Sequence, residues 1–195
     1  VSMTYEPFSK EPEYIECNRA FVERLPLENV DRFLDIACGT GTVSSLLLER
    51  FPEAHLNGVD LDPVQIDLST ATWTELGHTV RHGFELTEDY ENGKPVVVLG
   101  VGSGDVLQFP DETVDCVTIA NAIHMLPDMS KFFAEVARVL KPGGVFGFNS
   151  GFYAGCNPPG TERHMYQWLR EATYYIDKWN ERRKAEGKEP IRRQH

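Results

Sequence analysis

The sequence lacks several features that mark special classes of protein. Its apolar runs are far shorter than the ~20 residues that a membrane-spanning helix needs, and no basic segment followed by an apolar core opens the chain. Its four cysteines are widely separated and form no C-x-x-C pair, which disfavours a disulfide framework or a zinc ribbon. We therefore expect a cytoplasmic protein with reduced thiols and no membrane span.

An excess of basic residues is also missing. The chain carries 19 Lys and Arg against 30 Asp and Glu, a formal net charge of −11. An acidic molecule repels phosphate backbones, so we expect no nucleic acid as a general partner and favour a small neutral or cationic substrate. His78 and His82 are four residues apart but have no evident third ligand, so we predict no metal site.

The 195 residues and the hydrophobic content of 41% fit a globular domain with a substantial core. The chain is organised around residues 30–41, VDRFLDIACGTG. A short apolar run carrying Asp35 leads into a turn formed by Gly39 and Gly41, and Thr42 is expected to cap the helix that follows. A strand, a glycine turn and a helix start form the nucleotide-binding half of a Rossmann-like unit.

Two kinds of cofactor compete for such a unit. Dinucleotide enzymes use G-x-G-x-x-G, with the helix start facing a pyrophosphate. In this sequence Ser44 occupies the third glycine position, and Asp35 places a negative charge where a diphosphate would not benefit from it. An aspartate before the turn better suits a cationic ligand.

The spelling DIACGTGT resembles the first motif of the class I S-adenosylmethionine-dependent methyltransferases, in particular the small-molecule group that includes the quinone-biosynthesis methyltransferases. A later helix followed by Lys141-Pro142-Gly143-Gly144 and a strand is similar to another landmark of that family. The resemblance covers Val30 to Ser150, and Ala37 departs from it by standing at the first glycine position. It implies an α/β fold with a Rossmann-like doubly wound sheet, S-adenosyl-L-methionine as cofactor, S-adenosyl-L-homocysteine as product, and methyl transfer to an O, N or C nucleophile of a small, apolar or aromatic acceptor.

Two further acidic positions extend the pattern. Asp60 ends a predicted strand at about the interval expected for a carboxylate that binds a ribose diol, and its two oxygens can accept both hydroxyl protons. Leu61 could lie against the adenine face, and Asp62 is expected to cap the helix starting at Pro63. The alternative for Asp60 is a solvated aspartate at a strand end.

The resemblance also implies roles for the element Gly104-Asp105-Val106. The Asp105 carboxylate would accept a hydrogen bond from the adenine amino group, and the Val106 N–H would donate to a ring nitrogen. On the methyltransferase hypothesis, Asp35 orients the methionine amino group of the cofactor, directly or through a water molecule. A turn aspartate that caps its own backbone remains the alternative for Asp105.

The reactive end is expected after the strand Val114–Ala120, because ligands of open α/β sheets bind outside the carboxyl ends of the strands. Asn121 and His124 follow there, and the unperturbed pKa of His124 suits proton removal near neutral pH. A packed, hydrogen-bonded imidazole is the alternative. In the resembled family the leading segment often covers the site, which makes Tyr5 and Tyr14 candidates for a lid; surface packing is the other interpretation.

The predicted site residues fall into three groups. For the cofactor they are Asp35, Ala37, Cys38, Gly39, Thr40, Gly41, Asp60, Leu61, Gly104, Asp105, Val106 and Asn121. For catalysis they are His124 and Tyr14, and for the substrate they are Tyr5, Phe152, Tyr153 and Tyr166.

The predicted organisation has a lid segment at 1–29, a cofactor-binding core at 30–150, and a helical cap with a polar basic tail at 151–195. Gly77 to Lys94 reads as a long surface excursion, and Thr161 to Gly187 as one long helix. The last strands of a complete sheet are not evident, so we expect a fragment or a shortened sheet that a second copy or another chain could complete. A non-catalytic or partner-dependent module is the main alternative function, and an NAD-dependent oxidoreductase is the less favoured one.

Overall fold

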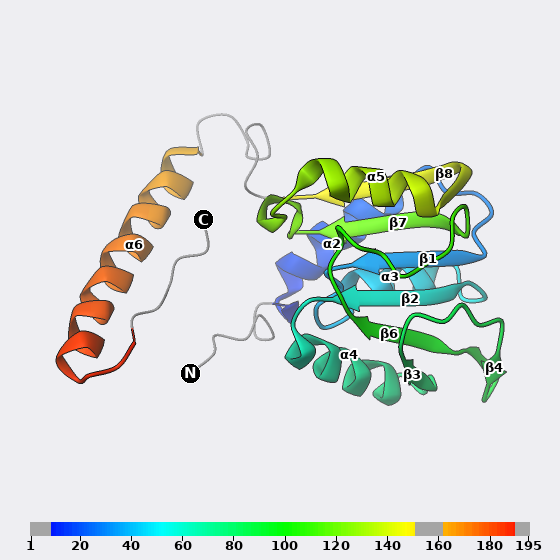
Figure 1. Ribbon diagram of the computed structural model, residues 1–195, viewed down its shortest axis with the longest axis horizontal. Helices are drawn as coiled ribbons and strands as arrows, with labels where there is room; N and C mark the ends of the chain where they lie inside the picture. Colours follow the sequence, from blue (N-terminus) through cyan, green and yellow to red (C-terminus); the bar gives the residue numbers. More distant parts are fainter. Residues whose placement is uncertain (1–8, 151–161, 190–195) are drawn as a thin grey trace. The chain divides into compact units, whose positions relative to one another are not determined.

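The computed structural model describes residues 9–150 and 162–189 and divides into two units, Val1–Asn149 and Ser150–His195 (Figure 1). The first unit contains a sheet of six parallel strands in the order β3-β6-β2-β1-β7-β8. Their bounds are β1 Arg32–Ile36, β2 His55–Asp60, β3 Val80–His82, β6 Val97–Val101, β7 Val114–Ala120 and β8 Leu140–Asn149. A parallel order with β1 beside β2 and β7 is that of a doubly wound α/β sheet, as predicted.

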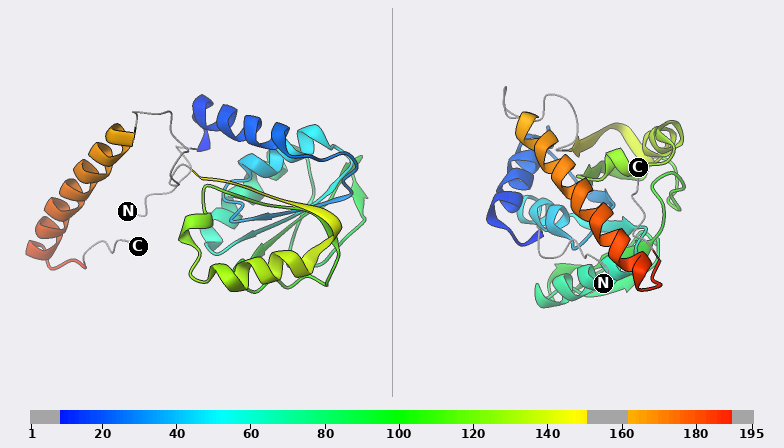
Figure 2. Two further views of the ribbon diagram at one scale, coloured as in Figure 1. Left: turned by 90° about the horizontal axis from the view of Figure 1, so that it is seen from above. Right: turned by 90° about the vertical axis from the view of Figure 1, so that its left-hand side faces the viewer.

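Helices cover both faces of this sheet. Figure 2 shows α2 (Pro12–Arg24) and α3 (Thr42–Arg50) on one face and α5 (Met129–Val139) on the other. The core on the first face includes Phe33, Leu47 and Trp73, the last from α4 (Pro63–Glu75). The second core is built under α5 around Leu34 and Phe132. Because both faces are covered, β1 and β2 are buried along their whole length rather than at alternating positions.

The prediction of a surface excursion over Gly77 to Lys94 is wrong in part. Strand β3 lies within it and pairs with β6 at the edge of the sheet, and β4 (Tyr90–Glu91) and β5 (Lys94–Pro95) form a small hairpin. Two polar side chains of the central strands hold this segment. Buried Arg32 donates to the carbonyl oxygen of Thr87 at 3.0 Å, and the Asn57 amide donates to that of Glu85, also at 3.0 Å.

Two local expectations are corrected, and one is confirmed. The Lys141–Gly144 stretch lies inside β8 instead of before it, next to a register shift between Val114 and Cys116. The cap position of α3 is Gly41, in the left-handed conformation, so Thr42 is already helical and does not cap it. Asp62 caps α4 as expected, because its side chain accepts from the Val64 N–H.

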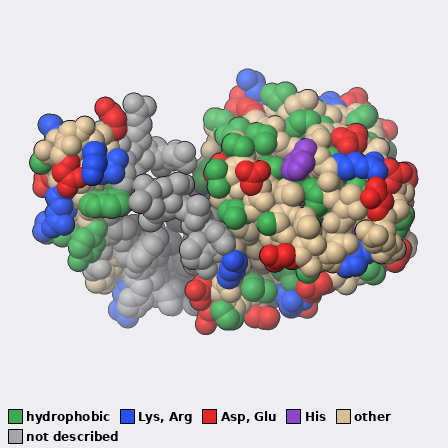
Figure 3. All heavy atoms as spheres, turned by 90° about the horizontal axis from the view of Figure 1, so that it is seen from below, with side chains coloured by type: hydrophobic (Ala, Val, Ile, Leu, Met, Phe, Trp, Pro, Cys, Tyr) green, Lys and Arg blue, Asp and Glu red, His purple; other side chains and the backbone are tan. Residues whose placement is uncertain are grey.

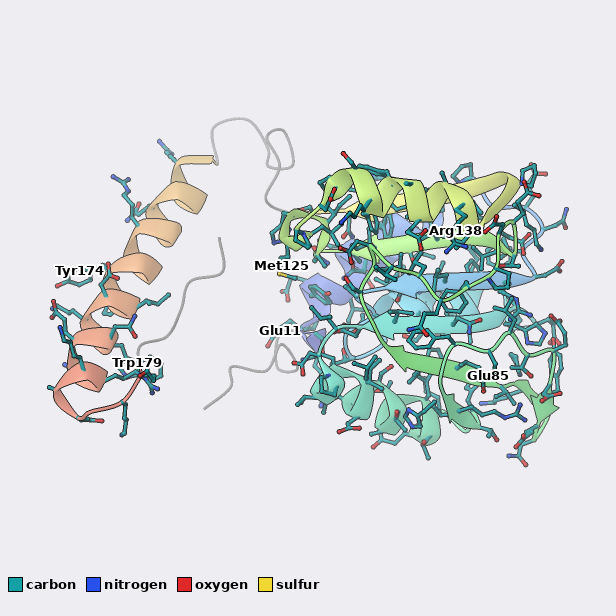
Figure 4. The ribbon with its side chains drawn as sticks, viewed as in Figure 1. Glu11, Glu85, Met125, Arg138, Tyr174 and Trp179 are labelled. Carbon is teal, nitrogen blue, oxygen red and sulfur yellow. The ribbon has the colours of Figure 1, made fainter. Side chains whose placement is uncertain are left out.

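The second unit contains α6 (Glu162–Ala185), which confirms the long helix predicted there. Its described aromatic side chains, Tyr174, Tyr175 and Trp179, are exposed (Figure 4). No helix among the described residues is long and apolar enough to cross a membrane. On the face of the first unit drawn in Figure 3, acidic, basic and hydrophobic side chains are interspersed.

Candidate functional site

The site begins at the glycine turn between β1 and α3. Ala37, Gly39 and Gly41 all have positive φ, at 53°, 54° and 88°, and this left-handed conformation favours glycine. A side chain at Gly41 would also collide with α4, since its Cβ would lie 3.1 Å from Ser69 Oγ and 3.2 Å from Trp73 Nε1. The turn is therefore pressed against α4 and presents backbone, not side chains, at the end of β1.

Asp35 lies under this turn and binds protein groups with both of its oxygens. Thr118 Oγ1 donates to Asp35 Oδ1 at 2.8 Å, and the Ser44 hydroxyl donates to Oδ2. The side chain is buried, and burial raises the pKa of Asp35 to about 6 although these hydrogen bonds oppose the shift. In this arrangement the carboxylate fastens the first turn of α3 to strands β1 and β7.

Asp60 lies at the carboxyl end of β2, next to the glycine turn. Its Oδ2 accepts from the Gly39 N–H at 2.9 Å and its Oδ1 from the Asp62 N–H at 2.9 Å. Burial also raises the pKa of Asp60. A carboxylate offers about four acceptor positions, so each oxygen still has room for a further donor such as a ribose hydroxyl.

The neighbouring strand supplies the loop with Asp105. The Gly102 N–H donates to the Asp60 carbonyl oxygen at 2.9 Å, which joins this loop to the end of β2. Asp105 accepts from the Ser103 hydroxyl, whereas the Val106 N–H donates to the Ser103 carbonyl oxygen at 3.3 Å. The hydrogen bond from the Val106 N–H is long. The prediction that this N–H donates to a ring nitrogen of adenine would require its bond to Ser103 to be replaced.

Two large apolar side chains are strongly exposed beside these aspartates. Leu61 is 72% exposed and Val106 is 65% exposed. Scattered exposed apolar residues need no explanation, but these two follow the ends of β2 and β6, which are neighbours in the sheet. Their position suits contact with the flat face of a purine.

Gly104 and an ion pair on α5 also hold the loop that contains Asp105 in place. A Cβ at Gly104 would lie 2.8 Å from Ile36 Cγ2, so only glycine fits there. Arg138, labelled in Figure 4, donates to the carbonyl oxygens of Leu107 at 2.8 Å and Phe109 at 2.7 Å. Glu135 accepts from the Leu107 N–H at 2.7 Å and binds Arg138.

The polar groups at the ends of β7 and β8 lie together. Asn121 has a positive φ of 56°, and its N–H donates to the Asn149 side-chain oxygen at 2.9 Å. The Asn121 amide lies 3.3 Å from the Tyr14 hydroxyl of α2. The structure thus brings Tyr14 and Asn121 together, although they are 107 positions apart in the sequence.

His124 lies on the short 3-10 helix η1 (Ile123–Met125). Its neighbour Met125 is labelled in Figure 4, at the left edge of the first unit, where strands β2 and β6 end. The His124 side chain is exposed, and partial burial lowers the pKa of its imidazole below the usual 6.5. The neutral form therefore predominates at neutral pH, as a proton acceptor requires.

Of the remaining predicted residues, one group lies in the glycine turn and the other lies outside the part of the chain that the structure describes. Ala37, Cys38 and Thr40 belong to the glycine turn, where Cys38 is buried and its N–H donates to the Val59 carbonyl oxygen. Tyr5, Phe152 and Tyr153 lie outside the described residues, as does the side chain of Tyr166.

Sequence reasoning did not select four polar residues that shape this site: Ser44 and Thr118 under the turn, and Asn18 and Asn149 beside Asn121. Each is a common residue within a helix or strand, and no motif marks it. For Ser44 a signal existed, because its hydroxyl stands where a dinucleotide-binding turn has glycine.

Comparisons with known proteins agree with this geometry. A family model described as a methyltransferase domain matches residues 34–148. The demethylmenaquinone methyltransferase of Symbiobacterium thermophilum is 28% identical over 130 residues, which cover 66% of this chain and 46% of that protein. A phthiotriol/phenolphthiotriol dimycocerosates methyltransferase of Mycobacterium ulcerans is 33% identical over 113 residues, 58% of this chain and 35% of that protein.

The fold has solved counterparts too. The crystal structure of a SAM-dependent methyltransferase from Aquifex aeolicus matches with a TM-score of 0.60 at 20% identity, covering 80% of this chain and 77% of that one. At this identity the likeness concerns the fold alone. The chain spans about half the length of the first curated relatives it matches.

Proposed function

Since the chain belongs to the methyltransferase-domain family, whose model covers 115 of its 195 residues, we propose that it binds S-adenosyl-L-methionine at the carboxyl ends of β1, β2 and β6 and transfers its methyl group to a small molecule. The observation that carries the proposal is the convergence of a left-handed glycine turn with Asp60, which has acceptor positions to spare.

The residues fit the cofactor in three ways. Asp60 would accept from the ribose hydroxyls, and Asp105 from the adenine amino group. Leu61 and Val106 would cover the purine faces with their exposed side chains. The turn at Gly39 to Gly41 allows close approach because no side chain projects from either glycine.

When bound, the cofactor supplies an electrophilic methyl group on a sulfonium. The protein's own contribution is mainly orientation, because placing the nucleophile in line about 3 Å from the methyl carbon can lower the barrier by several kcal/mol. His124 would take the proton from an acceptor that is protonated at working pH, and Tyr14 would orient that acceptor. The acceptor would receive the methyl carbon, and S-adenosyl-L-homocysteine would be the product that leaves.

The class of acceptor is part of the proposal. The curated relatives include enzymes named for demethylmenaquinone and for phthiotriol or phenolphthiotriol dimycocerosates. An apolar or aromatic small molecule is proposed as the acceptor for this chain.

Calorimetric titration with S-adenosyl-L-homocysteine tests the cofactor assignment. Asp60→Ala should weaken binding by about tenfold to a hundredfold, the effect of losing hydrogen bonds to a charged acceptor. Asp67→Ala is the control, since Asp67 is an exposed aspartate on the same helix that Asp62 caps. Unchanged affinity in a folded Asp60→Ala protein would remove the ribose assignment.

A partner-dependent form of the same activity is a second candidate. Strand β8 ends the order of the described sheet, and Phe148 on it and Phe133 on α5 are 48% and 43% exposed. One similar structure is a complex of a Trm112 methyltransferase activator from Haloferax volcanii with a methyltransferase. Light scattering combined with an activity assay distinguishes the two cases: an active monomer rules out the second candidate, and activity that requires another chain supports it.

A further inference from the structure

Three asparagines from three separate elements form one hydrogen-bonded cluster beside the carboxyl ends of β7 and β8. Asn18 comes from α2, Asn121 follows β7, and Asn149 ends β8. The Asn149 amide donates to Asn18 Oδ1 at 2.9 Å, and the Asn121 amide lies 3.4 Å from the same oxygen. Asn18 is 1% exposed, so the cluster is anchored inside the protein.

Backbone groups fix the orientation of each side-chain amide. The Tyr14 carbonyl oxygen can only accept, so the Asn18 atom that contacts it at 2.9 Å must be the Nδ2 donor. The Asn121 N–H can only donate, so the Asn149 atom facing it must be Oδ1. The Asn18 oxygen therefore faces the other two amides, and both must present Nδ2 to it.

One polar atom of the cluster is left for a ligand. With its Nδ2 turned toward Asn18 and Tyr14, Asn121 keeps Oδ1 as an acceptor to which none of the described residues donates. Asn121 is half-buried, and its Oδ1 is not among the four buried side-chain atoms that lack a partner in the described part of the chain. This oxygen therefore reaches solvent.

Its place in the sheet indicates which group it meets. Ile36 and Ile119 are paired at the ends of the neighbouring strands β1 and β7, so Asn121 and the glycine turn both lie just beyond the carboxyl ends of these two strands. Asp35, which was predicted to orient the cofactor's amino group, is only 1% exposed, so its carboxylate does not reach the surface of the turn. An ammonium group held at this turn needs another acceptor.

We propose that Asn18 and Asn149 are positioning residues that hold Asn121 so that its side-chain oxygen accepts a hydrogen bond from the ammonium group of the bound methyl donor. The inference rests on the proposed function and extends it to residues on α2 and β8. It also assigns a role to α2, because the side-chain oxygen of Asn18 is the acceptor that the other two amides share.

The test compares two ligands by calorimetry: S-adenosyl-L-homocysteine and its deamino analogue, in which hydrogen replaces the α-amino group. The unmodified chain should prefer the amine by about tenfold to a hundredfold, the range for a hydrogen bond to a charged group. Asn121→Ala should abolish this preference by weakening only the amine-containing ligand. Asn149→Ala and Asn18→Ala should reduce the preference in the same direction.

Asn57→Ala is the matched control. Asn57 is another buried asparagine with two hydrogen bonds, to Glu85 and Arg32, so its loss should lower the melting temperature without changing the preference. An Asn121→Ala protein that keeps the full preference, or an Asn57→Ala protein that loses it equally, overturns the inference alone. If the unmodified chain binds neither ligand, the proposed function itself fails.

Discussion

At the scale of single residues, Asp35 shows how one carboxylate can serve folding in a site where the sequence pattern predicts ligand binding. Its pKa is about 6 in the folded chain and about 3.9 in an unfolded one. The folded state therefore binds the proton more tightly. The corresponding stabilisation is complete below about pH 4 and is lost as the pH rises through 6.

Asp35→Asn should remove this pH dependence. We expect the unfolding free energy of the variant, relative to the unmodified chain, to rise by about 2 to 3 kcal/mol between pH 4 and pH 7. The amide also changes the hydrogen bonds with Ser44 and Thr118, but that effect is the same at both pH values. Urea unfolding at several pH values measures the difference, with Asp67→Asn on the exposed side of α4 as control; parallel curves for Asp35→Asn and the unmodified chain would contradict it.

Residue chemistry also explains what the sequence could and could not predict. Gly39, Gly41 and Asp62 were predictable because each has a local reason, a turn that excludes a side chain or a helix start that needs an acceptor. The roles of Asn18 and Asn149 could not be predicted, because they depend on contacts between elements more than 100 positions apart in the sequence. Ala37 adopts a left-handed conformation, which the presence of an alanine does not predict.

At the scale of elements, the strands that are buried on both faces were the easiest to predict. Strand β7 has the predicted bounds, Val114–Ala120, and it is rich in β-branched and apolar residues. Strand β3 was missed because its three residues are polar or half-buried and its place is set by pairing with β6, a strand that follows later in the sequence. The Lys141–Gly144 stretch was predicted to lie before β8 because its glycines suggested a turn. The strand instead includes this stretch and continues through a register shift.

Helix α5 connects to the proposed adenine site through Arg138. Arg138→Gln should release the segment after Asp105, because it removes the ion pair with Asp111 and the bonds to Leu107 and Phe109. The arginine side chain is 30% exposed, so we expect a stability loss of only about 1 to 2 kcal/mol, together with weaker binding of S-adenosyl-L-homocysteine.

Thermal unfolding and calorimetry measure the two effects separately. Lys131→Gln on the same helix is the control, since Lys131 makes only a 3.7 Å contact with Asp128 on the surface. If Arg138→Gln lowers stability but leaves the affinity unchanged, α5 supports the fold without shaping the site.

At the scale of the whole molecule, the proposed cofactor site belongs to the first unit. Both hydrophobic cores lie within residues 22–139 and the residues packed against them, and every described cofactor candidate precedes Asn149. The second unit contributes α6, whose described side chains are mostly exposed. Cofactor binding and acceptor selection can therefore be separated by experiment.

A chain ending at Asn149 should unfold cooperatively and bind S-adenosyl-L-homocysteine with an affinity within about threefold of the full chain, because both hydrophobic cores and every described cofactor candidate lie in the first unit. Circular dichroism and calorimetry provide the measurements. The shortened chain should at the same time lose turnover of an apolar acceptor if the segment 151–195 selects it, as the aromatic residues there led us to predict. A shortened chain that folds but no longer binds the cofactor product would instead assign part of the cofactor site to that segment.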